Sequence, residues 1–277
     1  MSVERARRPG PTVRTRVVEV SGENVTRHED RLATEEPLEI RLAWPGAAAQ
    51  RLAVTMRTPG HDFELAAGWL VHEQILAPGD LESVRYCTDD ELSESEEFNV
   101  VTVQSSAPPA FLPQARAISS ACGVCGTASI DDALRAAPGV SAHVVLPLPL
   151  VQGLPDELRA AQPGFDRTGG LHAAGLFEAD GTAVVVREDV GRHNAVDKAV
   201  GSQILAGAPC PPVLVLSGRV GFELVQKAVV SGIAAVVAVG APSSLAVTLA
   251  ERAGLGLVGF TRPDRCVVYA GAARFGV

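Results

Sequence analysis

Short stretches of alternating apolar and polar residues dominate the first 116 residues, and a period of two is typical of half-buried β-strands. One stretch differs, because the apolar residues from Phe63 to Leu70 recur at helical spacing. Thr58-Pro59 precedes it and offers a helix cap and a proline at the first helical position. We expect a small α+β domain in which a sheet packs around this one helix. The predicted strands cover 14–20, 38–42, 51–56, 82–87 and 98–103.

In the second half, apolar runs alternate with helix-like segments. The turn Ala179-Asp180-Gly181 joins two strands into a hairpin. Strands that then alternate with helices predict a parallel sheet with right-handed crossovers, and hence an α/β fold. The predicted strands are 171–177, 182–187, 213–216, 233–239, 257–260 and 266–269, and the helices are 192–205, 221–230 and 244–253.

Turn residues and composition divide the chain into four segments. Residues 1–12, rich in arginine, proline and glycine, are predicted to be disordered. Residues 13–116 form the small strand-rich α+β domain, and residues 128–277 form the α/β domain. Residues 117–127 between them are predicted to be a mobile loop, because this stretch is punctuated by glycine and proline.

Composition and charge restrict the function. The 277 residues carry a formal net charge of −8, which argues against nucleic-acid binding because that requires a basic face. Five irregularly spaced cysteines indicate a reducing compartment rather than a disulfide scaffold. The chain starts without an apolar leader, and glycine, serine and proline interrupt the apolar stretch 229–247. We expect a cytoplasmic protein that binds neither nucleic acid nor membrane.

Two thiols stand close together in Cys122-Gly123-Val124-Cys125-Gly126. The glycine after each cysteine lets another molecule approach the sulfur. Ser129 begins a predicted helix, so Cys125 lies just ahead of a helix N-terminus, where the thiolate is favoured. Asp131 and Asp132 oppose this effect, so we expect modest activation.

The cysteine pair has several interpretations. A structural zinc site needs four ligands, whereas Cys87, Cys210 and Cys266 stand alone. A thioredoxin-like redox pair needs a βαβ context, whereas proline-rich sequence precedes this motif. Two small buried cysteines fit poorly with so many glycines. We favour a sulfur-handling thiol on a mobile loop, with no metal bound.

Polar clusters follow several predicted strands of the second half, over residues 187–194, 217–219, 240–243 and 259–262. Loops at the carboxyl ends of parallel strands line one crevice, which is where ligands bind. Helix N-termini and arginines there suit phosphate, and Phe260 could stack on a flat base. We expect an anionic, phosphate-bearing ligand. The candidate residues are Arg187, Arg192, His193, Asn194, Ser217, Arg219, Arg262 and Arg265.

Structural roles would explain some of these residues without a ligand, as ion pairs or as a buried histidine. The convergence of four clusters on one sheet end favours a shared pocket. The structural alternatives pair Arg187 with Asp189, His193 with Asp197 and Glu223 with Lys227, and place His172 in the core.

Several motifs occur in a fixed order along the chain. They are Arg57-Thr58-Pro59-Gly60-His61-Asp62, Cys122-x-x-Cys125-Gly126, Thr168-Gly169-Gly170-x-His172, Arg187-Glu188-Asp189-Val190-Gly191-Arg192-His193-Asn194, Ser217-Gly218-Arg219 and Gly259-Phe260-x-Arg262. From about residue 15 to the C-terminus the chain resembles the formate dehydrogenase accessory sulfurtransferases, the FdhD family. The run 187–194 is highly specific for that family.

The resemblance implies a sulfurtransferase that receives persulfide sulfur from a cysteine desulfurase. It implies delivery of that sulfur to the molybdenum of a bis-(molybdopterin guanine dinucleotide) cofactor, the bound substrate, for formate dehydrogenase. Cys122 matches the family's persulfide cysteine, and we expect Cys125 to assist it. The resemblance also implies a cytidine deaminase-like fold for the second half, and a homodimer. The family's guanine-dinucleotide contact matches Phe260, Thr261, Arg262, Pro263, Asp264 and Arg265.

This chain departs from the family pattern at Gly221 and Gly240, where serines are expected, so it lacks those hydroxyl groups. Zinc deaminases also carry a Cys-x-x-Cys, but they need His-x-Glu and a proline before the first cysteine. Here the stretch from His61 to Glu64 is one residue too wide and Ala121 replaces the proline, so deamination is not expected. A non-catalytic cofactor-binding chaperone stays open as the alternative function.

Overall fold

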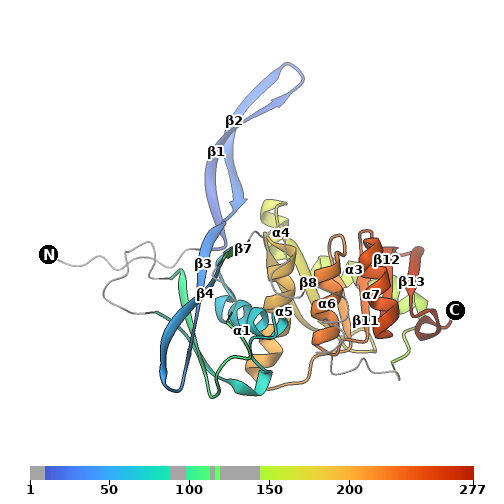
Figure 1. Ribbon diagram of the computed structural model, residues 1–277. Helices are drawn as coiled ribbons and strands as arrows, with labels where there is room; N and C mark the ends of the chain where they lie inside the picture. Colours follow the sequence, from blue (N-terminus) through green and yellow to red (C-terminus); the bar gives the residue numbers. More distant parts are fainter. Residues whose placement is uncertain (1–9, 88–97, 113–115, 119–143) are drawn as a thin grey trace.

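The computed structural model describes residues 10–87, 98–112, 116–118 and 144–277. The described strands form three sheets, of two, five and six strands, and Figure 1 shows the five- and six-stranded sheets joined through a pair of helices. The chain is therefore of the mixed α/β class, as expected. The cytidine deaminase-like arrangement of its second half stays a prediction.

The five-stranded sheet comes from the first half of the chain, in the order β5-β6-β3-β4-β7. In β3, Leu38, Ile40 and Leu42 are fully buried, because alternate residues of a strand face the same side. They pack against helix α1, so the predicted sheet around one helix is confirmed. The elements are β3 (Glu36–Trp44), β4 (Ala47–Arg57), α1 (Asp62–His72), η1 (Pro78–Asp80), β5 (Leu81–Tyr86), β6 (Val100–Ser105) and β7 (Arg116–Ile118).

Helix α1 begins at Asp62 and not at the predicted Thr58-Pro59 cap. The residue at its N-cap is His61, which adopts a left-handed conformation with φ 57°. The Thr58 hydroxyl is used elsewhere, because it accepts a hydrogen bond from the backbone N–H of Val190 at 3.1 Å. A partner 132 residues away in the sequence thus overrides the local capping signal.

A long hairpin of β1 (Thr12–Ser21) and β2 (Asn24–Ala33) projects from the body, as Figure 1 shows in blue. The sequence did not predict β2, because its polar residues do not alternate with apolar ones. Thr12 pairs with Ala33, and the N–H of Thr34 donates to the carbonyl of Pro11 at 3.0 Å. The predicted disordered segment 1–12 is therefore wrong at its last residues, and residues 1–9 lie outside the described part of the chain.

The six-stranded sheet comes from the second half, in the order β13-β12-β11-β10-β8-β9. Parallel pairing joins only β10 to β11 and β11 to β12 in this sheet, so the expectation of a parallel sheet is wrong for its edges. Hairpins at both ends reverse the chain and make the sheet mixed. The strands are β8 (His172–Phe177), β9 (Ala183–Asp189), β10 (Val213–Leu216), β11 (Ala235–Ala238), β12 (Gly256–Arg262) and β13 (Arg265–Ala270), followed by η2 (Ala272–Phe275).

Helices cover both faces of this sheet. Helices α5 (Arg192–Ala206), α6 (Phe222–Val230) and α7 (Ser244–Ala253) pack on one face, close to the predicted bounds. Helix α3 (Leu148–Ala160) packs on the other face, and the short α4 (Pro163–Thr168) follows it. Neither α3 nor α4 was predicted, and α3 contains a proline, Pro155, that weakens its helical signal.

Helices α1 and α5 cross closely and join the two halves. Gly68 of α1 lies against the backbone of Asp197, and Gly201 of α5 lies against the backbone of Glu64. A Cβ atom at either glycine would overlap the facing carbonyl oxygen. The two helix backbones therefore touch because both contact positions lack a side chain.

Candidate functional site

Four strand ends meet at one edge of the six-stranded sheet. β10, β11 and β12 are parallel, and β9 shares their direction because β8 is antiparallel to both β9 and β10. The carboxyl ends of these four strands therefore lie together, with His172 at the start of β8 beside them. The structure thus brings the four predicted polar clusters to one edge, although the sheet is mixed.

Three of the strand-end loops contact one another through glycines. The N–H of Gly240 donates to the carbonyl of Gly218 at 3.1 Å, and the N–H of Phe260 donates to the carbonyl of Gly240 at 3.2 Å. A Cβ atom on Gly240 would lie 2.8 Å from the Gly218 carbonyl oxygen and 2.9 Å from the Cα of Arg219. The expected serine would not fit at Gly240 without a backbone shift. At Gly221 the one atom of the described residues within 4 Å of an added Cβ is a carboxylate oxygen of the flexible Glu223 side chain, at 3.0 Å.

A cavity of about 550 Å³ opens beside these loops. This volume is in the usual range for small-molecule sites. One wall comes from the strand ends and includes four residues predicted to contact a ligand, and the other wall comes from α3, α4 and the turn after α4. The strand-end wall contains His172, Val190, Ser217, Val239, Thr261, Arg262 and Pro263, and the opposite wall contains Pro155, Asp156, Leu158, Arg159, Gln162 and Phe165.

Positive charge gathers at the strand-end wall of this cavity. His172 is half-buried, and burial together with the nearby charges of Arg192 and Arg219 lowers the pKa of His172. This shift favours the neutral form of the imidazole. Arg262 is exposed and donates through Nη1 to the carbonyls of Val239 at 3.1 Å and Thr261 at 2.7 Å. This edge of the cavity suits an anionic group.

The remaining residues of the predicted 260–265 contact lie outside the cavity lining. Phe260 has a left-handed backbone with φ 50°, and 41 % of its surface is exposed. Asp264 and Arg265 are exposed at the turn between β12 and β13. Among the phenylalanines of the described residues, Phe165 of α4 lines the cavity and Phe260 does not.

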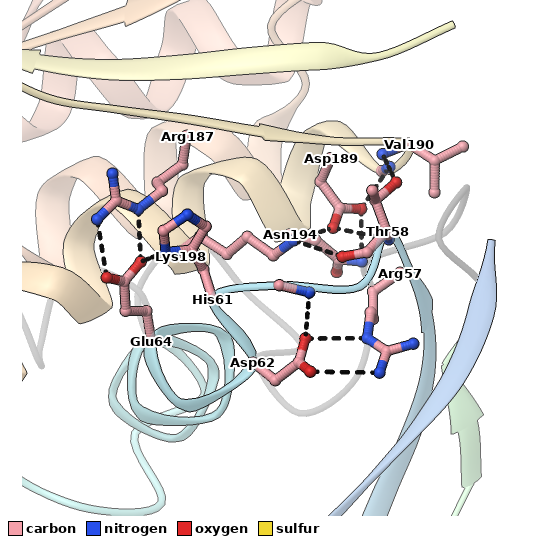
Figure 2. A network of polar contacts seen from close by, with 12 residues as sticks. Arg57, Thr58, His61, Asp62, Glu64, Arg187, Asp189, Val190, Asn194 and Lys198 are labelled. Atoms are coloured by element: carbon pink, nitrogen blue, oxygen red, sulfur yellow. Dashed lines mark hydrogen bonds and ion pairs between the residues drawn. The ribbon is translucent and has the colours of Figure 1, made fainter. Parts of the chain in front are cut away.

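Arg187 contacts the first half of the chain and does not line this cavity. Its Nε and Nη2 donate to the two carboxylate oxygens of Glu64 on α1, at 2.6 and 2.8 Å (Figure 2). His61 lies 3.2 Å from the same carboxylate. Burial raises the pKa of Glu64, but the hydrogen bonds from Arg187 and His61 outweigh it and lower the pKa to about 2. The structural alternative that paired Arg187 with Asp189 is wrong.

Asp189 is fully buried and joins the two halves of the chain (Figure 2). One carboxylate oxygen accepts from the Thr58 N–H at 3.1 Å and lies 2.7 Å from the Nζ of Lys198. The other accepts from the Gly191 N–H at 2.8 Å and the Asn194 amide at 3.1 Å. Both oxygens are therefore satisfied within the protein, and Asp189 is not free to bind a ligand.

The neighbours of Asp189 in the motif have similar internal contacts. Glu188 accepts from the backbone N–H groups of Gly164 and Phe165, both at 2.7 Å, and so fixes the start of α4. Asn194 donates to the carbonyl of Met56 at 2.8 Å. The prediction placed Asn194 in the ligand pocket, but in the structure Asn194 bonds to the first half of the chain. Glu188 of the same motif instead holds the start of α4, which forms part of the cavity wall.

His193 is buried beside Glu223, with 3.8 Å between its Nε2 and the nearer carboxylate oxygen. Within the described residues this Nε2 has no hydrogen-bond partner, and the same is true of the Nε of Arg192. Burial and the charges of Lys227 and Arg192 lower the pKa of His193. The expected helix-face pair of His193 with Asp197 is not formed.

Asp197 instead belongs to a buried cluster that joins α1, α5 and α6. Its carboxylate lies 2.5 Å from Nδ1 of His72 and 2.6 Å from Nζ of Lys227. The Nε2 of His72 lies 2.9 Å from the hydroxyl of Ser231. Sequence spacing alone paired Lys227 with Glu223, but the structure pairs Lys227 with Asp197.

The Arg57–Asp62 motif also has internal partners. Arg57 is fully buried, and its Nε and Nη2 donate to the Asp62 carboxylate at 3.0 and 3.3 Å (Figure 2). The Tyr86 hydroxyl donates to the same carboxylate at 2.8 Å. These contacts hold the loop before α1, in which Thr58 bonds to Asp189, Val190 and Lys198 of the second half of the chain.

The two candidate sulfur-carrying residues, Cys122 and Cys125, lie outside the described residues, as do most of the predicted loop 117–127 and the helix from Ser129. Their roles stay predictions. Among the described helices, none combines the length and apolar character needed to span a membrane.

Comparison with known proteins gives consistent matches. The sequence model of the FdhD/NarQ family matches residues 33–276. The chain is 49 % identical to the sulfur carrier protein FdhD of Streptomyces coelicolor over 274 residues, which is 95 % of each chain. It is 46 % identical to the protein of the same name from Nocardia farcinica over 268 residues, 95 % of this chain and 94 % of the relative. A crystal structure described as that of a formate dehydrogenase accessory protein from Desulfotalea psychrophila has a TM-score of 0.74 and 24 % identity, over 95 % of this chain and 99 % of that one.

Proposed function

This chain belongs to the FdhD/NarQ family, and we propose that it is a sulfur carrier that serves the maturation of formate dehydrogenase. In this proposal it takes persulfide sulfur from a cysteine desulfurase and passes it to the molybdenum of a bis-(molybdopterin guanine dinucleotide) cofactor. The names of the relatives support the sulfur-carrier role, and the name of the structural neighbour supports the link to formate dehydrogenase.

The sulfur chemistry is assigned to the Cys122 thiolate. It attacks the outer sulfur of the desulfurase persulfide, so a new S–S bond forms on Cys122 while the desulfurase thiolate leaves. This exchange involves no net oxidation. In the second step the S–S bond of the Cys122 persulfide breaks and Cys122 leaves as the thiolate. The outer sulfur becomes a sulfide ligand by taking two electrons from the molybdenum, which is substrate here and enters the step in its reduced, four-valent state. Cys125 assists as the neighbouring thiol.

The cavity at the sheet edge is assigned to one guanine nucleotide arm of the cofactor. Its volume of about 550 Å³ suits a nucleotide, and this is the observation that carries the binding half of the proposal. Ser217 and Arg262 in its wall, with Arg192 and Arg219 nearby, provide hydrogen-bond donors and positive charge for a diphosphate. We further propose that the protein acts as a homodimer in the cytoplasm.

Persulfide formation tests the carrier role. The protein is incubated with a cysteine desulfurase and cysteine, and intact-mass spectrometry is expected to show a gain of one sulfur atom on Cys122. The Cys122→Ala variant should lose this gain and should fail to activate formate dehydrogenase in complemented cells. Cys210→Ala is the matched control, because burial raises the pKa of Cys210 to about 12 and keeps it a thiol at neutral pH.

Full formate dehydrogenase activity with Cys122→Ala would contradict the sulfurtransferase. If that variant still bound the cofactor and still activated the enzyme, the protein would be a cofactor-binding chaperone. Loss of activation together with loss of sulfur loading supports the carrier.

A further inference from the structure

His193 in the first turn of α5 is a buried imidazole whose inner nitrogen has no hydrogen-bond partner. Only 7 % of the residue is exposed, and its Nε2 makes no hydrogen bond within the described residues. This nitrogen faces the first turn of α6, where the nearer carboxylate oxygen of Glu223 lies 3.8 Å away. A buried polar atom without a partner is costly, so a role beyond packing would explain why the imidazole is kept there.

The carboxylate of Glu223 determines which ring nitrogen carries the proton. A lone pair on Nε2 of His193 would face this negative group, so the favoured tautomer has its N–H at Nε2 and its free lone pair at Nδ1. In the part of the chain that the structure describes, Nδ1 makes no hydrogen bond and is not one of the buried atoms that lack a partner, so it is in contact with solvent. One nitrogen directed at a carboxylate and the other free is the arrangement of a general base.

The charges around His193 favour its neutral form. Burial lowers the pKa of His193, and the charges of Lys227 and Arg192 lower it further. The carboxylates of Asp197 and Glu223 act in the opposite direction. A neutral imidazole is the form that accepts a proton. An anion formed by that proton transfer would be stabilised by Arg192 and by the N-terminus of α5, which has no side-chain cap.

The last described strand before Cys122 ends close to His193. Strand β7 pairs with β4 so that Ile118 lies opposite Thr55, and the Thr55 hydroxyl donates to the side-chain carbonyl of Asn194 at 3.4 Å. Asn194 is the residue that follows His193. Cys122 comes four residues after Ile118, and a stretch of four residues extends at most about 14 Å. The thiol assigned to the sulfur chemistry is therefore attached to the fold beside this imidazole.

We propose that His193 is the general base that takes the proton from the Cys122 thiol, with Glu223 as its positioning residue. The proposal rests on the role of Cys122 in the proposed function. The S–H bond of Cys122 breaks, the proton goes to Nδ1 of His193, and the electron pair stays on the sulfur. The resulting thiolate attacks the outer sulfur of the desulfurase persulfide, and the proton passes to the desulfurase thiolate that leaves, so the step involves no net oxidation.

The pH dependence of Cys122 alkylation tests this base on the full chain. Iodoacetamide reacts with the ionised thiol, and peptide mass spectrometry follows its rate between pH 6 and pH 9. In the unmodified protein the rate is expected to reach half of its maximum at least about one pH unit below the ordinary thiol pKa of about 8.5. His193→Gln should move this midpoint to about 8.5 and slow alkylation at pH 7 by about tenfold. Glu223→Gln should give a smaller shift in the same direction.

His28→Gln is the matched control. It removes another histidine that contacts a glutamate, because His28 lies 3.0 Å from Glu19 on the exposed hairpin of β1 and β2. This variant should leave the alkylation profile of Cys122 unchanged. The melting temperature of each variant is measured to verify folding, and if His193→Gln does not fold, the profiles of the unmodified protein and of Glu223→Gln decide.

The outcomes separate the two proposals. A midpoint at about 8.5 in the unmodified protein, or a low midpoint that neither His193→Gln nor Glu223→Gln shifts, would overturn this inference. Sulfur loading of Cys122 by the desulfurase would then leave the proposed function standing. The expected profile without any sulfur loading would support the base and contradict the proposed function. A shift with His28→Gln equal to that with His193→Gln would show a general effect and would overturn the inference.

Discussion

Glu64 on α1 receives two hydrogen bonds from Arg187 on β9, at 2.6 and 2.8 Å, across the interface between the two halves of the chain. The pair is bidentate and partly buried, and it involves a residue of the motif that most clearly identifies the family. A substitution at this pair should therefore lower the stability of the protein. Any loss of sulfur loading should follow from that lower stability.

Glu64→Gln is expected to lower the free energy of unfolding at pH 7 by about 2 kcal/mol, because it weakens a charge-assisted contact. Since the pKa of Glu64 is about 2 in the folded protein and 4.5 is its ordinary value, its contribution is complete above pH 4.5. It is lost as the pH falls from 4.5 towards 2. Urea unfolding of both proteins between pH 3 and pH 7 should show the difference shrinking in acid, and a constant difference would contradict the assignment.

Gly68→Ala and Gly201→Ala should each destabilise the protein by about 3 kcal/mol, because the added methyl group overlaps the backbone of the facing helix. Gly153→Ala is the control, since Gly153 lies in α3 with nothing within 4 Å of the added atom. That substitution should raise stability by about 0.5–1 kcal/mol through helix propensity alone. Thermal unfolding of the three variants tests this prediction. Similar effects at all three positions would argue against the close crossing of α1 and α5.

Substituting the expected serines at Gly240 and Gly221 should have opposite effects on the stability of the protein. Gly240→Ser should cost about 2 kcal/mol, because its Cβ meets backbone atoms of Gly218 and Arg219. Gly221→Ser should be neutral or stabilising by a few tenths of a kcal/mol, because Gly221 is an N-cap without a side-chain hydrogen bond, and serine supplies one. Melting temperatures would show this, and a well-folded Gly240→Ser protein would contradict the tight contact of these loops.

Glu73 at the end of α1 should make the protein less stable as the pH rises. Burial is the main cause that raises the pKa of Glu73 to about 7, and the nearby Asp197 adds to it while Lys227 opposes it. Below pH 4.5 the group is protonated in both the folded and unfolded states, and above pH 7 the folded protein must hold the charged form. Glu73→Gln should therefore be more stable than the unmodified protein by about 2 kcal/mol at pH 8 and equal to it at pH 4. Chemical denaturation at the two pH values tests this, and an equal gain at both would contradict it.

Much of the fold was predictable because its signals are local. The strand Val213–Leu216 and the helix Ser244–Ala253 were predicted at their observed bounds, since an apolar run and a capped amphipathic segment need no distant partner to be recognised. Strand β2 and helix α3 were not predicted. The first is a polar strand that depends on pairing with β1, and the second contains an internal proline.

The candidate site divides in the same way. The order of strands and polar loops along the chain was enough to predict that the loops after β9, β10, β11 and β12 gather at one sheet edge, because strands that run in the same direction bring their carboxyl ends together. The sequence by itself also established membership of the family through its motifs. Only the tertiary structure decided where each side chain of those motifs is used. Arg187 meets Glu64 and Asp189 meets Thr58 across more than a hundred residues, and the opposite cavity wall comes from two helices with weak local signals. A charged side chain has no intrinsic preference between a ligand and an internal partner, so its role depends on which groups the fold places within hydrogen-bonding distance.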